Sequence, residues 1–264
     1  MDIPYTRWYG AIEKRHSRRQ FDISRPIDAA TAAAIEKTCR DFRPFPDARV
    51  VFVQGEIGNI FRGFLPGYGK VRGTPAFLAV IGDKSSNTVN EDAGYTGEGV
   101  VLEANTLGLE TCWIAMFKKQ KTFAILKLED NESVLAVIPV GHAKESVALE
   151  EKMFTGLVKS HQRRPVEELV KGEVPADKNS WQYKSIEAAR LAPSALNRQP
   201  WGFEIGENSI TVSVRTGGSE MTVPKRLDCG IAMLHIEAAA GYTGKKGKWE
   251  PLKPPQVARF STVA

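Results

Sequence analysis

The stretch 192-APSALNRQPWGF-203 joins a helix-like run to a strand-like run and is dense in turn-forming and hydrogen-bonding residues. Pro193 and Pro200 each restrict the backbone angle φ and so stiffen the connection. Ser194 and Asn197 can hydrogen bond either to the surrounding backbone or to a ligand. From these residues alone, a loop that caps itself and a loop that binds a ligand are equally good interpretations.

A second cluster, 15-RHSRRQF-21, gathers basic residues and a serine close to the N-terminus. The planar guanidinium of arginine suits phosphate oxygens and polarised carbonyls, and a serine hydroxyl adds a donor, so an anion site is one interpretation. A short basic run is more often a solvated face. A nucleic-acid surface is also open, but it would need a broader basic stripe with interleaved aromatic residues.

A third stretch, 108-GLETCWIAMF-117, begins with a glycine typical of a helix end and continues as a strand. An edge strand in this place can offer a free backbone N–H to a ligand. Taken alone, a plain core strand is the better interpretation of these residues.

The expected elements mix helices and strands without regular alternation. Apolar spacing, capping residues and β-branched runs predict helices at 11–17, 28–42, 92–107, 185–192 and 227–240, and strands at 48–54, 76–82, 111–115, 134–140, 201–205 and 209–214. The basic, proline-rich stretch 244–260 is expected to lie extended over the surface. This order favours an α+β fold over a doubly wound parallel sheet.

Two long, small-residue helices open alike, one with Asp92-Ala-Gly94 and the other with Asp228-Cys-Gly230. Together with other short helical segments of similar sequence, they suggest two related halves, 1–145 and 146–264, packed helix against helix into one compact unit. The alternative explanation of this repeat is that short helical segments are similar by chance.

The composition combines 36 basic with 31 acidic residues, a net charge of +5 that suits an anionic ligand and does not require nucleic acid. Cys39, Cys112 and Cys229 form no CxxC pair, which favours buried thiols in a reducing, cytoplasmic setting. We see no signal peptide, no metal-ligand spacing and no apolar run long enough to cross a bilayer, so neither a metal nor a membrane is expected.

Taken together, the three clusters resemble the FMN-dependent nitroreductase family, from about residue 5 to residue 240. That family carries an RxSxR/K-F motif, a PSxxNxQPWxF loop and a long small-residue helix ending in GLxxxW. This chain shows RHSRRQF, PSALNRQPWGF and EANTLGLETCWI. The resemblance is greatest to the internally duplicated branch, and it implies a nitroreductase-like α/β/α sandwich formed by two fused half-repeats.

The chain departs from the ordinary family pattern in a complementary way. The first half has 39-CRDFRPFPDARVVF-52 where the serine and asparagine loop is expected, and the second half has 177-DKNSWQYKSIE-187 where the arginines are expected. Each half has lost what the other retains. A fused pair of this kind would keep one complete flavin site, and the chain would be a monomeric pseudo-dimer.

The resemblance also implies site residues. Arg15 and Ser17 match ligands of the FMN phosphate and ribityl chain, with His16 beside them through its backbone. Arg19 matches the basic residue that reaches the N1–C2=O edge of the flavin, where a cation stabilises the anionic reduced form. Arg163 resembles the late phosphate-binding arginine of the family.

The remaining implied contacts come from the other two motifs. Pro193, Ser194 and Asn197 match contacts to the isoalloxazine ring and ribityl chain from the opposite half. Met116 stands in Ala115-Met116, where the family usually has Glu-Gly, and it would supply a backbone N–H to flavin N5 while its bulk narrows the pocket.

The function implied is a ping-pong oxidoreductase that passes a hydride from NAD(P)H through FMN to a small electron acceptor, a nitroaromatic or quinone. No residue is expected to act as a catalytic acid or base, because the flavin carries the chemistry. An FMN-binding or flavin-sensing protein without rapid turnover is the alternative, and a basic nucleic-acid-binding protein is a remote one.

Overall fold

The computed structural model describes residues 1–55, 60–61, 71–144, 162–215 and 223–263. The N-terminal part contains α1 (Tyr5–Ile12), α2 (Ala29–Asp41), β1 (Ala48–Gln54), β2 (Ala76–Asp83), α3 (Val89–Thr106), β3 (Glu110–Thr111), α4 (Lys119–Ile125) and β4 (Glu132–Gly141). Its strands form an antiparallel sheet in the order β1-β2-β4-β3.

The C-terminal part contains α6 (Val166–Leu169), α7 (Trp181–Arg190), a short 3-10 helix (Ala195–Asn197), β5 (Trp201–Ile205), β6 (Ser209–Val214), α8 (Lys225–Tyr242), β7 (Gly247–Pro251) and β8 (Gln256–Thr262). Its strands form a second antiparallel sheet in the order β5-β6-β8-β7. The two sheets therefore follow one scheme: two strands, a long helix, then two more strands, with the last strand inserted beside the second.

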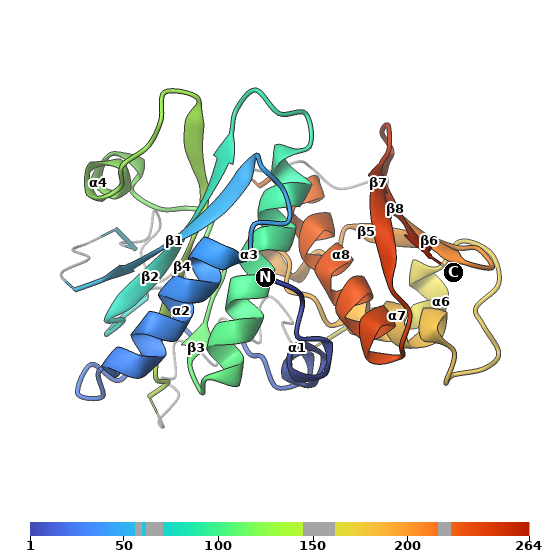
Figure 1. The fold of residues 1–264 in the computed structure, drawn as a ribbon, viewed down its shortest axis with the longest axis horizontal. Coiled ribbons are helices and arrows are strands. Elements are labelled where there is room, and N and C mark those ends of the chain that lie inside the picture. Colours follow the sequence, from blue (N-terminus) through green and yellow to red (C-terminus); the bar gives the residue numbers. More distant parts are fainter. Residues whose placement is uncertain (56–59, 62–70, 145–161, 216–222, 264) are drawn as a thin grey trace.

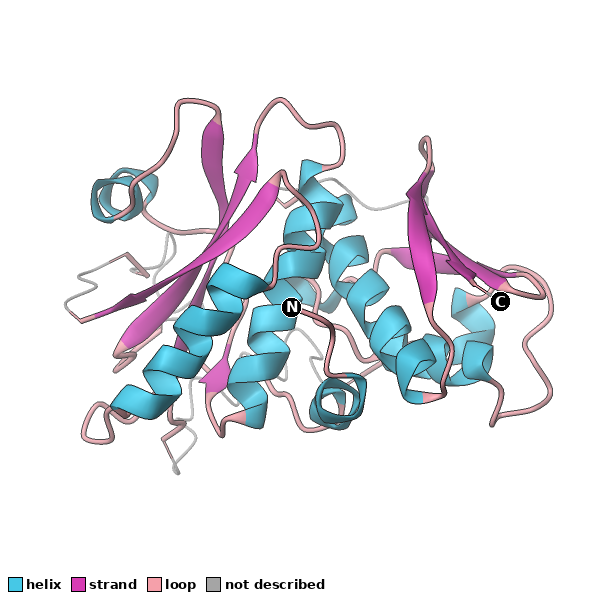
Figure 2. Cartoon of the chain, viewed as in Figure 1, coloured by secondary structure: helices cyan, strands magenta, loops and turns pink. Residues whose placement is uncertain are grey.

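The two sheets lie on opposite sides of a helical centre made chiefly of α2, α3, α8 and α7 (Figure 1; Figure 2). In the N-terminal part α4 lies beyond the sheet, so that part has helices on both faces. Both sheets are antiparallel and the helices are segregated, which confirms the predicted α+β class. None of the helices in the described ranges is both long and apolar enough to span a bilayer.

The long helices α3 and α8 contact each other through a reciprocal pair of glycines. A Cβ on Gly94 would lie 2.1 Å from the carbonyl oxygen of Leu227, and a Cβ on Gly230 would lie 2.0 Å from that of Glu91. Each glycine thus contacts the carbonyl three residues before its counterpart. Self-complementary contacts of this kind are typical of two-fold related interfaces.

Three sequence predictions were wrong in placement. The first helix ends at Ile12 rather than including residues 13–17, so the basic cluster that follows is extended. The strand expected at 111–115 is short, because β3 covers only Glu110–Thr111 and Ile114 beyond it forms an isolated bridge with Val137. The stretch 244–260 does not simply lie extended over the surface, because β7 and β8 within it belong to the second sheet. In β8, Val257, Ala258 and Phe260 are buried in the core that contains α8.

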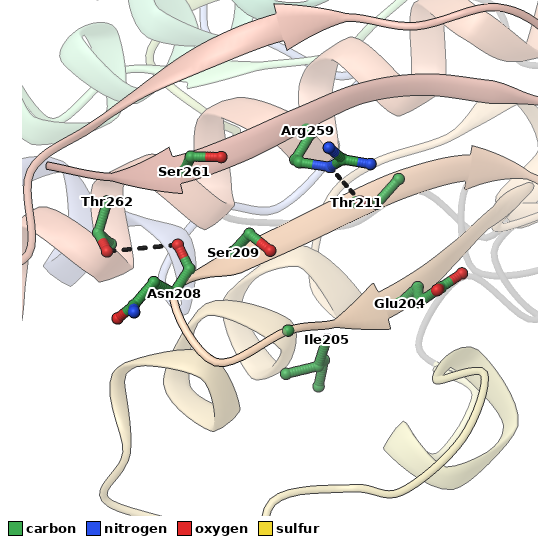
Figure 3. Close-up of a pocket in the computed structure, with 9 residues that line it drawn as sticks. Glu204, Ile205, Asn208, Ser209, Thr211, Arg259, Ser261 and Thr262 are labelled. Atoms are coloured by element: carbon green, nitrogen blue, oxygen red, sulfur yellow. Dashed lines mark hydrogen bonds between the residues drawn. The ribbon is translucent and has the colours of Figure 1, made fainter.

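The face of the second sheet that points away from α8 carries polar side chains around a shallow hollow (Figure 3). Arg259 donates from Nε to the Thr211 hydroxyl at 3.3 Å, and Ser209 and Ser261 lie along the same face. The alternate residues Ile210 and Phe260 point into the core, as the two-residue period of a strand requires. The hollow contains none of the candidate site residues.

Candidate functional site

The basic cluster runs as an extended segment beside β3. Ser17 pairs in parallel with Thr111, and the backbone N–H of Arg18 donates to the Thr111 carbonyl at 2.9 Å. Burial raises the pKa of Glu110 on the same strand, although the nearby charges of Arg18, His16 and Arg15 oppose this shift. The second and third sequence clusters, 15–21 and 108–117, therefore lie together.

Arg15 is buried, with only 6% of its surface exposed. Its Nε lies 3.8 Å from Glu98 Oε1, and its Nη1 lies 3.5 Å from the Ser17 hydroxyl. Among the described residues, Nε has no hydrogen-bond partner. This buried Nε faces Glu98, whereas Nη1 lies on the Ser17 side. A guanidinium held by charge through Nε can direct its Nη groups to an anionic group.

Glu98 connects Arg15 to both parts of the molecule. It projects from α3, and its Oε2 accepts a hydrogen bond from the Trp113 indole N–H at 2.7 Å. Its Oε1 lies 3.0 Å from His235 Nε2 on α8, whose Nδ1 lies 2.9 Å from the Ala188 carbonyl at the end of α7. Trp113 belongs to the third sequence cluster, so the carboxylate ties that cluster to the arginine.

Arg163 brings the C-terminal loop to the same place. Its Nη1 donates to Asn197 Oδ1 at 2.7 Å. The pKa of Arg163 is lowered to about 10, chiefly by burial and also by the neighbouring charges of Arg15 and Arg190. The charge of Arg15 thus acts on Arg163, which links the basic cluster electrostatically to the residue that is bonded to the proline-rich loop.

The loop itself has an unusual backbone conformation. Leu196, Asn197 and Gln199 have φ angles of 51°, 55° and 47°, in the left-handed region that residues other than glycine seldom adopt. Such strain persists only where the surroundings enforce it, and it concentrates at functional sites. Here the Ser194 hydroxyl accepts from the Gln199 backbone N–H at 3.0 Å and closes the turn from within.

Asp228, at the start of α8, holds the other side of this loop. Its carboxylate accepts from the backbone N–H of Ala195 at 3.2 Å and from Nε of Arg198 at 2.8 Å. The adjoining Gln199 side chain accepts from the backbone N–H of Arg164 at 2.9 Å. The loop is therefore fixed by both α8 and the segment that carries Arg163.

The pKa of Asp228 gives a stability prediction. Burial raises it to about 6, against about 3.9 in an unfolded chain, so the folded state binds the proton more tightly. The resulting stabilisation is complete below about pH 4 and is lost as the pH rises through about 6. Asp92 on α3 has a pKa raised to about 6 by burial and contributes in the same direction.

We therefore expect wild-type protein to lose stability between about pH 5 and about pH 7.5, and Asp228→Asn to lose about 1.4 kcal/mol less over that interval. Urea unfolding of both proteins at the two pH values measures the difference. Equal pH dependence in the two proteins would show that Asp228 does not titrate in this window.

The other candidates lie in different surroundings. Arg19 is partly buried and its carbonyl accepts from the Arg72 backbone N–H, whereas His16 is exposed. Pro193 is buried under the loop. Met116 lies between β3 and α4 with 47% of its surface exposed, and it takes no part in the polar contacts that join Arg15, Arg163 and Asn197.

Comparison with known proteins places the chain in a family. A family model described as "Putative TM nitroreductase" matches residues 7–240. The chain belongs to this nitroreductase family. No curated protein matches it.

Comparison with solved structures finds two further nitroreductases. A Thermotoga maritima protein described as a putative nitroreductase superposes with a TM-score of 0.63 at 19% sequence identity, covering 99% of this chain and 96% of its own, and it shares the fold. A nitroreductase with bound FMN from Bacteroides fragilis covers 54% of this chain and 91% of its own, with a TM-score of 0.44 and 18% identity.

Three residues of this nitroreductase site were not anticipated from the sequence: Glu98, His235 and Asp228. Glu98 and His235 are ionisable residues at buried positions of helices that are rich in small and apolar residues. A charged residue between Gly97 and Gly99, in a helix expected to be buried, was the signal available for Glu98. For Asp228 the only signal in the sequence is its position in the Asp-x-Gly opening that the two long helices share.

Proposed function

We propose that the chain is an FMN-dependent oxidoreductase that passes a hydride from NAD(P)H through FMN to a nitroaromatic or quinone-like acceptor. Family membership supports the oxidoreductase class. The observation that supports the cofactor most directly is the approach of Arg15 to Arg163, with Asn197 bonded to Arg163. A buried arginine, Arg15, and a partly buried one, Arg163, whose like charges act on each other, form a favourable site for a dianionic phosphate.

In this proposal Arg15, Ser17 and Arg163 hold the phosphate and ribityl part of FMN. Pro193, Ser194 and Asn197 contact the ring and ribityl chain from the loop. These residues bind and orient the cofactor, and the strained loop gives it a preformed surface. When bound, FMN supplies the hydride chemistry, so no side chain is assigned as an acid or base.

Arg19, His16 and Met116 complete the proposed set. Arg19 places a cation near the pyrimidine edge of the ring, which favours the anionic reduced form. His16 and Met116 act through their backbones, and the exposed Met116 side chain narrows the acceptor pocket. A narrow pocket over the ring would favour flat acceptors over bulky ones.

We also propose that residues 1–145 and 146–264 are two halves of a pseudo-dimer with one cofactor site between them. The shared strand scheme and the reciprocal glycine contacts support this division. The boundary itself falls outside the described residues. Because each half supplies different side chains to the site, one chain would bind one FMN.

The proposal predicts that the purified protein binds FMN in a one-to-one ratio and that NADH or NADPH bleaches the bound flavin without oxygen. FMN fluorescence titration measures the ratio, and stopped-flow absorbance measures the bleaching and its reversal by a quinone. Failure to bind FMN would overturn the proposal. Binding without bleaching would instead identify the flavin-sensing alternative.

A further inference from the structure

Glu98 is a fully buried carboxylate in the middle of α3. A buried charge is costly unless nearby groups compensate it, and a well-packed apolar residue is often as stable in the same place. The presence of an acid here therefore needs an explanation beyond helix packing.

The hydrogen-bond partners of Glu98 lie on α8 and in the stretch that follows β3. The Ala188 carbonyl can only accept, so His235 Nδ1 at 2.9 Å carries a hydrogen and donates it. The other ring nitrogen, Nε2, lies 3.0 Å from Glu98 Oε1, and a single proton between them serves this contact. With Trp113 donating to Oε2, Arg15 remains beside Oε1 at 3.8 Å.

The approximate two-fold relation between α3 and α8 assigns to the Glu98–His235 contact a matching pair of positions. That matching pair has no polar side chain. The reciprocal glycines, Gly94 and Gly230, set the correspondence between the helices, and four residues further along Glu98 corresponds to Leu234. One residue later, His235 corresponds to Gly99. Leucine and glycine suffice for packing there, so the polar pair is confined to the side that carries Arg15.

We propose that Glu98 and His235 are positioning residues that hold the Arg15 guanidinium towards the cofactor phosphate. This inference rests on the proposed function. Glu98 attracts Arg15 from the Nε side, where Nε lies 3.8 Å from Oε1, while Nη1 lies on the Ser17 side, so the guanidinium is oriented. His235, from the other half, fixes the carboxylate in turn, so α3 and α8 jointly determine where Arg15 points.

The test compares FMN with riboflavin, which has the same ring and ribityl chain but no phosphate. We expect Glu98→Gln to weaken FMN binding about 5- to 10-fold, the size of one weakened charge-assisted contact, while riboflavin affinity stays within about 2-fold. Fluorescence titration of each flavin gives both dissociation constants without any turnover. If Glu98→Gln weakened the binding of both flavins equally, so that the ratio of their dissociation constants stayed unchanged, the positioning role would be wrong.

Glu91→Gln is the matched control. Glu91 is also a buried acid on α3 that pairs with an α8 residue, Arg226, but both lie in the first turns of their helices, away from Glu98 and His235. We expect Glu91→Gln to lower the free energy of unfolding and to leave the ratio of the FMN and riboflavin dissociation constants unchanged.

A double-mutant cycle with Arg15→Gln tests the path through the arginine. If Glu98 acts by positioning Arg15, the double variant should lose no more FMN affinity than Arg15→Gln alone. Additive losses would contradict the inference. Should Glu98→Gln fail to fold, Glu98→Asp keeps the charge but withdraws it from Arg15, and the same change in ratio is expected. Wild-type protein that binds no FMN would refute the proposed function itself.

Discussion

Gly230→Ala is expected to lower the free energy of unfolding by about 3 kcal/mol or more, because the added methyl cannot be accommodated. Its Cβ would lie 2.0 Å from the Glu91 carbonyl oxygen and 2.7 Å from the Glu91 Cα. These are backbone atoms of a helix and cannot rotate away as a side chain would. The helices α3 and α8 must separate, and every contact along their interface weakens.

Gly94→Ala should have an effect of similar size, since its Cβ would lie 2.1 Å from the Leu227 carbonyl oxygen. Both substitutions require the same separation of the helices. We therefore expect the double variant to be less destabilised than the sum of the single variants. Urea unfolding curves of the three proteins measure this coupling.

Gly10→Ala is the control for the general effect of replacing a helical glycine. Gly10 lies in α1, and no atom comes within 4 Å of the position that a Cβ would take, so alanine meets open space. Its greater helix propensity should raise stability by about 0.5–1 kcal/mol. If Gly10→Ala and Gly230→Ala changed stability equally, close helix contact would not be the reason for the glycine.

Local sequence signals predicted most elements of this fold. The runs WGFEI and SITVSV coincide with β5 and β6, because β-branched and aromatic residues are bounded there by turn residues. Asp28 caps α2 as expected, accepting from the backbone N–H groups of Ala30 and Thr31. Gly108 ends the α3 region with a φ of 78°, the conformation that favours glycine.

The failures arose where tertiary contacts override local preference. In β8, QVARFST has little apolar alternation, yet it pairs with β6 on one side and β7 on the other. Residues 13–17 continue an apparently helical run, but pairing of Ser17 with Thr111 draws the chain into an extended segment. Neither partner could be identified from nearby sequence.

For the candidate site, the sequence motifs identified several of the residues that contact or act on one another. They did not identify the residues that hold those side chains in place. Arg15, Arg163 and Asn197 come from separate motifs and are brought together. Glu98 and His235 belong to no motif, and 137 positions separate them in the chain. Their relation depends on how α3 crosses α8, which a linear pattern does not contain.

Arg163→Gln is expected to weaken FMN binding roughly 10- to 100-fold, the loss of one charge-assisted phosphate contact of about 1.5–3 kcal/mol. In the absence of FMN, we do not expect Arg163→Gln to lower the free energy of unfolding by a comparable amount. Burial and the charge of Arg15 both lower the pKa of Arg163, so in the absence of an anion its charged form is disfavoured. A neutral glutamine removes that penalty, and we expect stability within about 1 kcal/mol of wild type.

Arg164→Gln removes the same charge one residue away. Arg164 is exposed and pairs with Glu168 at 3.2 Å, so we expect its FMN affinity to equal that of wild type. FMN titration and urea unfolding of both variants separate a local contact from a general loss of positive charge. If Arg164→Gln weakened FMN as much as Arg163→Gln, attraction would come from net charge and the two-arginine phosphate site would be wrong. If Arg163 binds the phosphate, Arg163→Gln should lose FMN affinity without losing stability, because the charge of Arg15 disfavours the charged form of Arg163 in the free protein and a bound anion would offset this effect.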